Sequence, residues 1–212
     1  MLRVIIVIFV VLLLLLIVEY LWKVKHYHTE LTRKFIHISV GSFVAFWPYF
    51  LHWDQIYLLA LGFLVVIVAS RLASIFRSIH SINRRTIGDF LFAVAITVVA
   101  LITHDRLIFT IAMLHLSLAD GIAAVIGTRY GKKNRYKVFG QYKSIIGTIA
   151  FWLCSLVLIT AFMLISHVNV ADSKLWLKVV WLPILATALE NIGVYGTDNI
   201  LVPVLIALVL SS

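Results

Sequence analysis

Leu2-Arg-Val-Ile-Ile-Val-Ile-Phe-Val-Val-Leu-Leu-Leu-Leu-Leu-Ile17 opens the chain with an apolar run that contains one charged residue, Arg3. A helix that crosses the hydrocarbon core of a bilayer needs about 20 mostly apolar residues. Because the run has one basic residue and no small-x-small cleavage site before Glu19, we expect a retained first helix and not a cleaved signal peptide.

The rest of the chain continues this pattern. Of the 212 residues, 63% are hydrophobic and 13% are charged, whereas soluble domains have roughly 25% charged residues. The predicted fold class is therefore all-α, a polytopic transmembrane helix bundle of about seven or eight helices. We expect residues 1–212 to form a single integral membrane domain. Whether the short fourth and eighth segments cross fully stays open. The expected helices span about 2–22, 35–51, 55–73, 88–103, 106–128, 145–166, 175–192 and 199–210.

The basic residues are distributed unevenly among the expected loops. If all eight segments cross, the loops after the first, third and fifth share one side and hold four, four and six Lys or Arg residues, against three in the opposite loops. Such an excess marks the cytoplasmic side, so both termini are expected outside. Anionic lipid headgroups are the default partner of this charge. The net charge of +9 therefore does not require a nucleic acid partner.

Arg33, Lys34 and His37 stand at the entrance to the second segment. On a helix, Arg33, His37 and Gly41 share a face, with Lys34 beside them. Two cations and an imidazole suit phosphate binding or proton transfer. The alternative is that both cations anchor the helix at the membrane surface and that His37 is a hydrogen-bonding residue within the bundle.

Asp120 lies in the stretch Leu118-Ala-Asp-Gly-Ile-Ala-Ala-Val-Ile-Gly-Thr-Arg-Tyr-Gly-Lys-Lys133. A carboxylate at membrane depth is costly and indicates a functional site. Its helix face continues through small residues to Gly127 and Gly131, which admit close approach. Gly127-x-x-x-Gly131 also fits a small-residue helix-packing pattern. Packing alone leaves the carboxylate, and the six Lys and Arg residues that follow, unexplained.

Lys143 and Ser144 open the sixth segment. A helix N-terminus with a nearby lysine is a site suited to phosphate, and Lys132 adds charge in the same loop. The loop lacks the G-x-x-x-x-G-K-[ST] pattern of a P-loop. We therefore expect a phosphate site of another kind.

Glu190, Asp198 and Asn199 surround the junction of the last two segments. Gly193 and Gly196 open the backbone there, and irregular backbone at membrane depth indicates a lined cavity. The alternative is an ordinary loop with a capping aspartate, which leaves Glu190, inside an apolar stretch, unexplained.

Together these residues resemble the polyprenol kinase family, which includes dolichol kinases, phytol kinases and CTP-dependent diacylglycerol kinases, with phosphatidate cytidylyltransferases as distant relatives. The resemblance covers about residues 30 to 205. Two departures are Ala119-Asp120 in place of the usual Gly-Asp, and Lys143-Ser-Ile-Ile-Gly-Thr148 in place of Lys-Ser-x-Glu-Gly-Ser. The motifs that carry the resemblance are Arg33-Lys34…His37…Gly41, Arg84-Arg85-Thr-Ile-Gly88, Asp120…Ala123…Gly127…Gly131-Lys132, Lys143-Ser-Ile-Ile-Gly147 and Glu190…Gly196-Thr-Asp198-Asn199…Pro203.

The resemblance implies transfer of a nucleotide γ-phosphate, typically from CTP, to the hydroxyl of a polyprenol, a phytol-like alcohol or a diacylglycerol at the cytoplasmic membrane face. Asp120 and Asp198 would hold Mg²⁺, assisted by Asn199. Glu190 or His37 would be the catalytic base, and the choice between them is open. The nucleotide-binding set would comprise Arg33, Lys34, Gly127, Gly131, Lys132, Lys143, Ser144 and Asn199.

Two other functions are compatible with the same residues. In nucleotidyl transfer, a phosphatidate-type substrate would attack the α-phosphate and pyrophosphate would leave. A small membrane transporter would place polar residues near the bilayer centre in both halves of a repeat. The sequence shows no repeat, and its polar clusters lie at one face. The lipid, the nucleotide base and the oligomeric state are left open.

Overall fold

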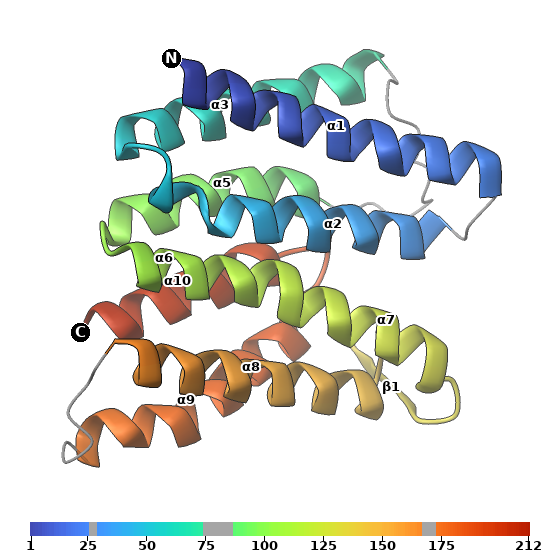
Figure 1. The fold of residues 1–212 in the computed structure, drawn as a ribbon. Helices are drawn as coiled ribbons and strands as arrows, with labels where there is room; N and C mark the ends of the chain where they lie inside the picture. The colour runs from blue at the N-terminus through green and yellow to red at the C-terminus, as the bar shows by residue number, and fades with distance from the viewer. Residues whose placement is uncertain (26–28, 74–86, 167–172) are drawn as a thin grey trace.

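The computed structural model describes the backbone of residues 1–25, 29–73, 87–166 and 173–212, and the side chains of 1–20, 34–69, 87–166 and 176–212 (Figure 1). Within these ranges the chain is a bundle of helices with one short β-hairpin. The prediction of an all-α fold is confirmed. The main helices are α1 (Leu2–Lys25), α2 (Thr29–Ala45), α3 (Trp53–Ala73), α5 (Gly88–Ile102), α6 (Arg106–Leu114), α7 (Asp120–Tyr130), α8 (Ile145–Ile165), α9 (Ser173–Ile192) and α10 (Asp198–Ser211).

The helices run side by side, and both termini lie at the same end of the bundle (Figure 1). Close pairs are α3 with α5, α7 with α8, α8 with α9, and α10 with α5. A fully buried apolar core between them includes Ile96, Phe109, Met113, Phe151 and Ile206. This core fixes the positions of the helices whose other ends, away from the two termini, carry the polar residues of a pocket.

Within the described residues, three stretches of helix are long and apolar enough to cross a membrane, namely Leu2–Tyr20, Arg106–Tyr130 and Ile145–Ile165. The second of these joins α6 and α7 through a π-helical segment, His115–Ala119. The expected fourth and eighth segments correspond to α5, with 15 residues, and α10, with 14. Both are shorter than the roughly 20 residues that a crossing helix needs, and they pack against each other.

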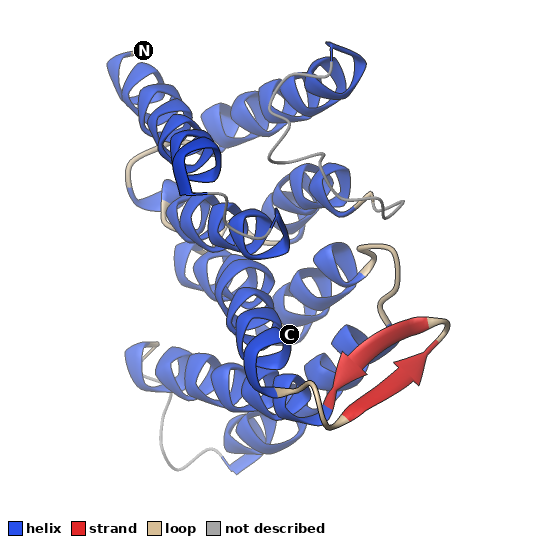
Figure 2. Cartoon of the chain, turned by 90° about the vertical axis from the view of Figure 1, so that its right-hand side faces the viewer, coloured by secondary structure: helices blue, strands red, loops and turns tan. Residues whose placement is uncertain are grey.

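A β-hairpin between α7 and α8 was not expected from the sequence. Strands β1 (Arg135–Val138) and β2 (Gln141–Ser144) are antiparallel. The two residues that join them, Phe139 and Gly140, have φ of 45° and 87°, and two consecutive positive φ angles are the pattern of a type I′ turn. The hairpin lies at one edge of the bundle and contacts α7 and α8 (Figure 2).

The hairpin also changes how Lys143 is placed. The sequence predicted that Lys143 opens a helix, but the structure places it in β2 and starts α8 two residues later. Ser144 is the N-cap of α8, and its hydroxyl accepts a hydrogen bond from the backbone N–H of Gly147 at 3.1 Å. The Lys143 side chain therefore projects from a strand and not from the first turn of a helix.

Glycines bring α7 and α8 together at their crossing. A Cβ added at Gly147 would lie 3.0 Å from the Ala123 carbonyl oxygen and 3.3 Å from the Gly127 Cα. A Cβ at Gly131 would overlap Ser144. A Cβ at Gly127 would lie 2.7 Å from the Ser144 Oγ, so neither Gly127 nor Gly131 has room for a larger side chain and both serve close packing.

Candidate active site

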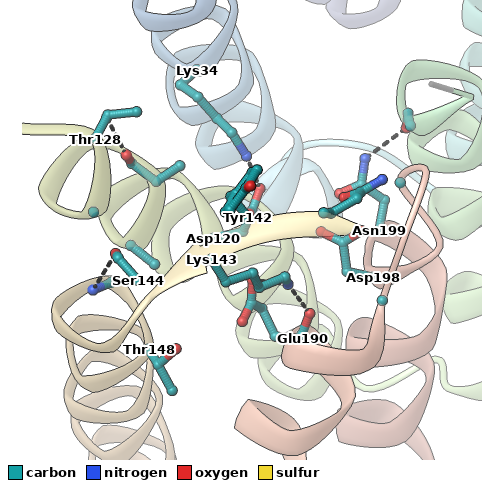
Figure 3. Close-up of a pocket in the computed structure, with 18 of the residues that line it drawn as sticks. Lys34, Asp120, Thr128, Tyr142, Lys143, Ser144, Thr148, Glu190, Asp198 and Asn199 are labelled. Atoms are coloured by element: carbon teal, nitrogen blue, oxygen red, sulfur yellow. Dashed lines mark hydrogen bonds and ion pairs between the residues drawn. The ribbon is translucent and has the colours of Figure 1, made fainter. Parts of the chain in front are cut away.

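A polar pocket of about 700 Å³ lies at the end of the bundle that carries the hairpin. Its walls come from α2, α5, α7, α8, α9, α10 and the hairpin, so residues distant in sequence meet there (Figure 3). Most of the predicted site residues line it: Lys34, His37, Asp120, Gly127, Lys143, Ser144, Glu190, Asp198 and Asn199.

Three carboxylates converge inside the pocket. One carboxylate oxygen from each of Asp120, Glu190 and Asp198 lies within 4.8 Å of the others. Asp120 and Glu190 are only 7% and 9% exposed. Negative charges held so close together repel one another and require compensation by cations.

Lys34 of α2 supplies part of that compensation to Asp120, and His37 of the same helix lies beside the same carboxylate. The Lys34 Nζ lies 2.7 Å from Asp120 Oδ2, and the His37 Nε2 lies 3.4 Å from the same oxygen. The His37 Nε2 is also 2.8 Å from the carbonyl oxygen of Leu116. Since a carbonyl only accepts hydrogen bonds, this nitrogen is the donor.

The π-helical segment that precedes Asp120 provides that Leu116 carbonyl. Its first residue, His115, is fully buried, with Nδ1 2.8 Å from the Ile111 carbonyl oxygen and Nε2 3.0 Å from Ser155 Oγ of α8. Nδ1 therefore carries the proton, and Nε2 accepts from the Ser155 hydroxyl. These contacts hold the irregular turn between α2 and α8, at the point where the chain turns Asp120 toward the pocket. His115 is thus a packed, hydrogen-bonded helix residue.

Lys143 of β2 compensates the second carboxylate. Its Nζ lies 2.6 Å from Glu190 Oε1 and also donates to the Glu190 backbone carbonyl at the end of α9. Tyr136, opposite Lys143 in the hairpin, bonds to Asn191 and to Thr148. One face of the hairpin is thus fastened to α8 and α9.

The turn between α9 and α10 positions Asp198. Gly193 lies so close that an added Cβ would be 2.6 Å from the Asp198 Cβ and 2.9 Å from its backbone nitrogen. The neighbouring Asn199 donates through Nδ2 to the Gly88 carbonyl of α5 at 2.7 Å. Asn199 therefore joins α10 to α5 through its side-chain nitrogen. Its side-chain oxygen is the atom that could assist in holding a metal.

Two of the predicted residues that the structure describes, Gly131 and Lys132, do not line the pocket. Gly131 packs beneath Ser144. Lys132 is exposed in the turn that follows α7. Arg33 lies in α2, but its side chain is outside the described part of the chain, as are Arg84 and Arg85 of the predicted motif.

The sequence interpretation missed the pocket residues contributed by the hairpin, chiefly Arg135, Gln141 and Tyr142. A signal was present, because alternating four-residue stretches on either side of Phe139-Gly140 are typical of a hairpin with a tight turn. It also missed Thr128, Thr148 and Tyr195.

The donor set suits a hard divalent cation. Carboxylate oxygens are the protein ligands that Mg²⁺ prefers, and it usually takes one or two of them together with substrate phosphates. Asp120 and Asp198 could supply such ligands, and Lys34 and Lys143 are the cations that lie beside the carboxylate cluster. The pocket therefore fits a metal–phosphate complex.

Fold and pocket together define the class of protein: a helical membrane protein with a buried cluster of carboxylates and lysines in a polar pocket. The chain is 30% identical over 186 residues to phytol kinase of Synechocystis sp., an alignment that covers 85% of this chain and 78% of the relative. The chain belongs to the polyprenol kinase family, which includes the phytol kinases. It is a phosphotransferase, and at the level of the family a kinase of lipid alcohols.

Two further comparisons found nothing. No model of a protein family matches the chain. No solved structure matches it.

Proposed function

We propose that the chain transfers the γ-phosphate of CTP to the hydroxyl of a lipid alcohol, in a multi-pass membrane domain whose pocket opens to the cytoplasm. The observation that carries the proposal is the cluster of three carboxylates within 4.8 Å, two of them paired with lysines. The named activity of the Synechocystis relative favours a phytol-like alcohol as acceptor.

Phosphoryl transfer needs positioning and charge stabilisation more than covalent catalysis. Asp120 and Asp198 would hold Mg²⁺, which would neutralise charge on the phosphate oxygens. Lys34 and Lys143 would bind the same oxygens, exchanging part of their contacts with Asp120 and Glu190 for contacts with the nucleotide. Both lysines lie beside the carboxylates that would hold the metal, which supports this role.

Glu190 is the better candidate for the base that orients the lipid hydroxyl. The His37 Nε2 donates to the Leu116 carbonyl, so this nitrogen does not accept a proton there. Glu190 presents a carboxylate in the pocket beside Asp198. The hydroxyl proton would pass to Glu190 as the lipid oxygen bonds to the γ-phosphorus, and the nucleoside diphosphate would leave with the electron pair of the broken P–O bond.

The basic loops support a cytoplasmic pocket. The segment after α7, which holds Lys132, Lys133 and Arg135, lies at the same end of the bundle as the pocket. By the positive-inside rule this end faces the cytoplasm, where nucleoside triphosphates are available.

The test is an assay of the purified protein in lipid vesicles with γ-labelled CTP or ATP and a panel of lipid alcohols: polyprenol, phytol and diacylglycerol. We expect label on a lipid alcohol, most efficiently from CTP. A failure to label any lipid with either nucleotide would contradict the proposal.

A further inference from the structure

The two faces of the hairpin differ in what they contact. In an antiparallel pair, directly opposed residues lie on the same face and neighbours along a strand alternate. Tyr136 and Lys143 are opposed, as are Lys137 and Tyr142. The Tyr136–Lys143 face is fastened to α8 and α9, so Tyr142 must project from the other face.

Tyr142 lines the pocket and is nevertheless 60% exposed. The Lys137 Nζ lies 5.5 Å from the centroid of its ring, within the range of a cation–π contact. Lys137 covers one side of the ring, and the exposure of the side chain leaves ring surface open to a ligand. Figure 3 shows Tyr142 on the side of the hairpin where Lys34 lies.

A nucleotide that enters this pocket brings a flat base as well as phosphates. The lysines and carboxylates account for the phosphates but offer no flat apolar surface. Among the described residues that line the pocket, the phenol rings are those of Tyr142 and Tyr195. Tyr142 directly precedes Lys143 in β2, whereas Tyr195 lies in the turn before α10, where its carbonyl accepts from the Ile87 N–H. Tyr142 is therefore the ring next to the expected phosphate position.

We infer that Tyr142 is the stacking platform for the nucleobase of the phosphate donor, an inference that rests on the proposed function. The hairpin then binds both ends of the nucleotide: β2 offers the Tyr142 ring to the base from one face and the Lys143 ammonium to the phosphates from the other. Every nucleobase has a π-face, so the ring supplies affinity without choosing between bases.

The experiment compares the full-length Tyr142→Ala and Tyr142→Phe variants with Tyr130→Ala. Tyr130 is a matched control because it is also 60% exposed and lies 5.5 Å from a cation, Arg129, but is not a pocket residue. Loss of a stacking ring costs roughly fivefold or more in base binding. We expect Tyr142→Ala to raise the KM for CTP and for ATP by at least about that factor. Tyr142→Phe and Tyr130→Ala should leave both values near those of the unaltered protein.

Two further readouts separate stacking from other roles. Inhibition by inorganic tripolyphosphate, which has no base, should be the same in Tyr142→Ala and the unaltered protein, as should the KM for the lipid alcohol. An unchanged nucleotide KM in Tyr142→Ala, or an equal loss of tripolyphosphate binding, would overturn the inference.

Lys143→Ala, measured in parallel, distinguishes this failure from that of the proposed function. If Lys143→Ala impairs nucleotide use and Tyr142→Ala does not, the stacking inference alone is wrong. If neither substitution affects the nucleotide, the proposed use of the pocket is wrong as well, and the inference is lost with it.

Discussion

Lys143 and Glu190 stand 47 residues apart in the sequence, yet the Lys143 Nζ lies 2.6 Å from Glu190 Oε1. The ion pair joins β2 to the end of α9 and closes one side of the pocket. Both side chains are largely buried, with 14% and 12% exposed. This ion pair holds the Lys143 ammonium group beside the carboxylate cluster before any substrate binds.

Lys143→Ala should therefore weaken nucleotide use. A lost charge-assisted contact is worth roughly 1.5 kcal/mol or more, which corresponds to at least about tenfold in kcat/KM for the nucleotide. Lys133→Ala is the control, because Lys133 is exposed in the same segment outside the pocket, and exposed charges contribute little. Steady-state kinetics in vesicles measure both. Equal, small effects would assign the basic segment to membrane anchoring alone.

Asp120→Asn and Asp198→Asn should each remove a proposed metal ligand while keeping the shape of the side chain. We expect each to lower activity by more than about a hundredfold, since even an outer-shell partner of a metal is worth 10–100-fold. Binding of Mn²⁺, followed by its paramagnetic resonance, should weaken in parallel without any turnover. Asp54→Asn, in the first turn of α3, is the control. Unaltered Mn²⁺ binding in both pocket variants would show that the carboxylates are structural.

The ionisable residues in apolar stretches were the informative part of the sequence. Asp120 and Glu190 could be assigned to a site because burying a carboxylate in a membrane helix is costly without a function. The apolar runs likewise predicted an all-α membrane fold, because a helix that crosses the bilayer must match the hydrocarbon thickness.

The pairings within the site could not be predicted in the same way. Lys34 meets Asp120 across 86 residues, and that contact depends on how the helices pack. The hairpin was missed because its short, basic strands resemble a solvated loop, although their alternation on either side of Phe139-Gly140 is typical of a hairpin. The glycines were ambiguous for a related reason: a small residue serves helix packing and ligand approach equally well, and only the Gly131–Ser144 contact decides for packing at that position.

Ser155→Ala should disturb the pocket from a distance. It removes the donor to His115 Nε2 at a fully buried position, and a buried polar atom left without a partner costs about 1–3 kcal/mol. We expect a lower Tm in detergent and reduced turnover, because the π-helical segment leads directly into Asp120. Ser166 lies at the C-terminal end of α8, the helix that also holds Ser155, and Ser166→Ala should change neither the Tm nor the turnover. A Ser155→Ala protein as stable and active as its parent would remove this positioning role.

The orientation of the bundle can be tested with single cysteines in a Cys154→Ser background. A cysteine at Asn134, beside the hairpin, should resist a membrane-impermeant thiol reagent in intact cells. A cysteine at His52, in the turn before α3 at the other end, should react. The reverse pattern would place the pocket outside the cytoplasm and separate it from its nucleotide.

The fate of each phosphate of the donor tests the central claim most directly. Two parallel reactions would use CTP labelled at the γ-phosphate or at the α-phosphate, with the lipid alcohol that the panel assay selects. We predict that the γ-label moves to the lipid, that CDP accumulates in equal amount, and that Asp120→Asn abolishes both. Appearance of the α-label on the lipid together with pyrophosphate would contradict kinase chemistry and indicate nucleotidyl transfer.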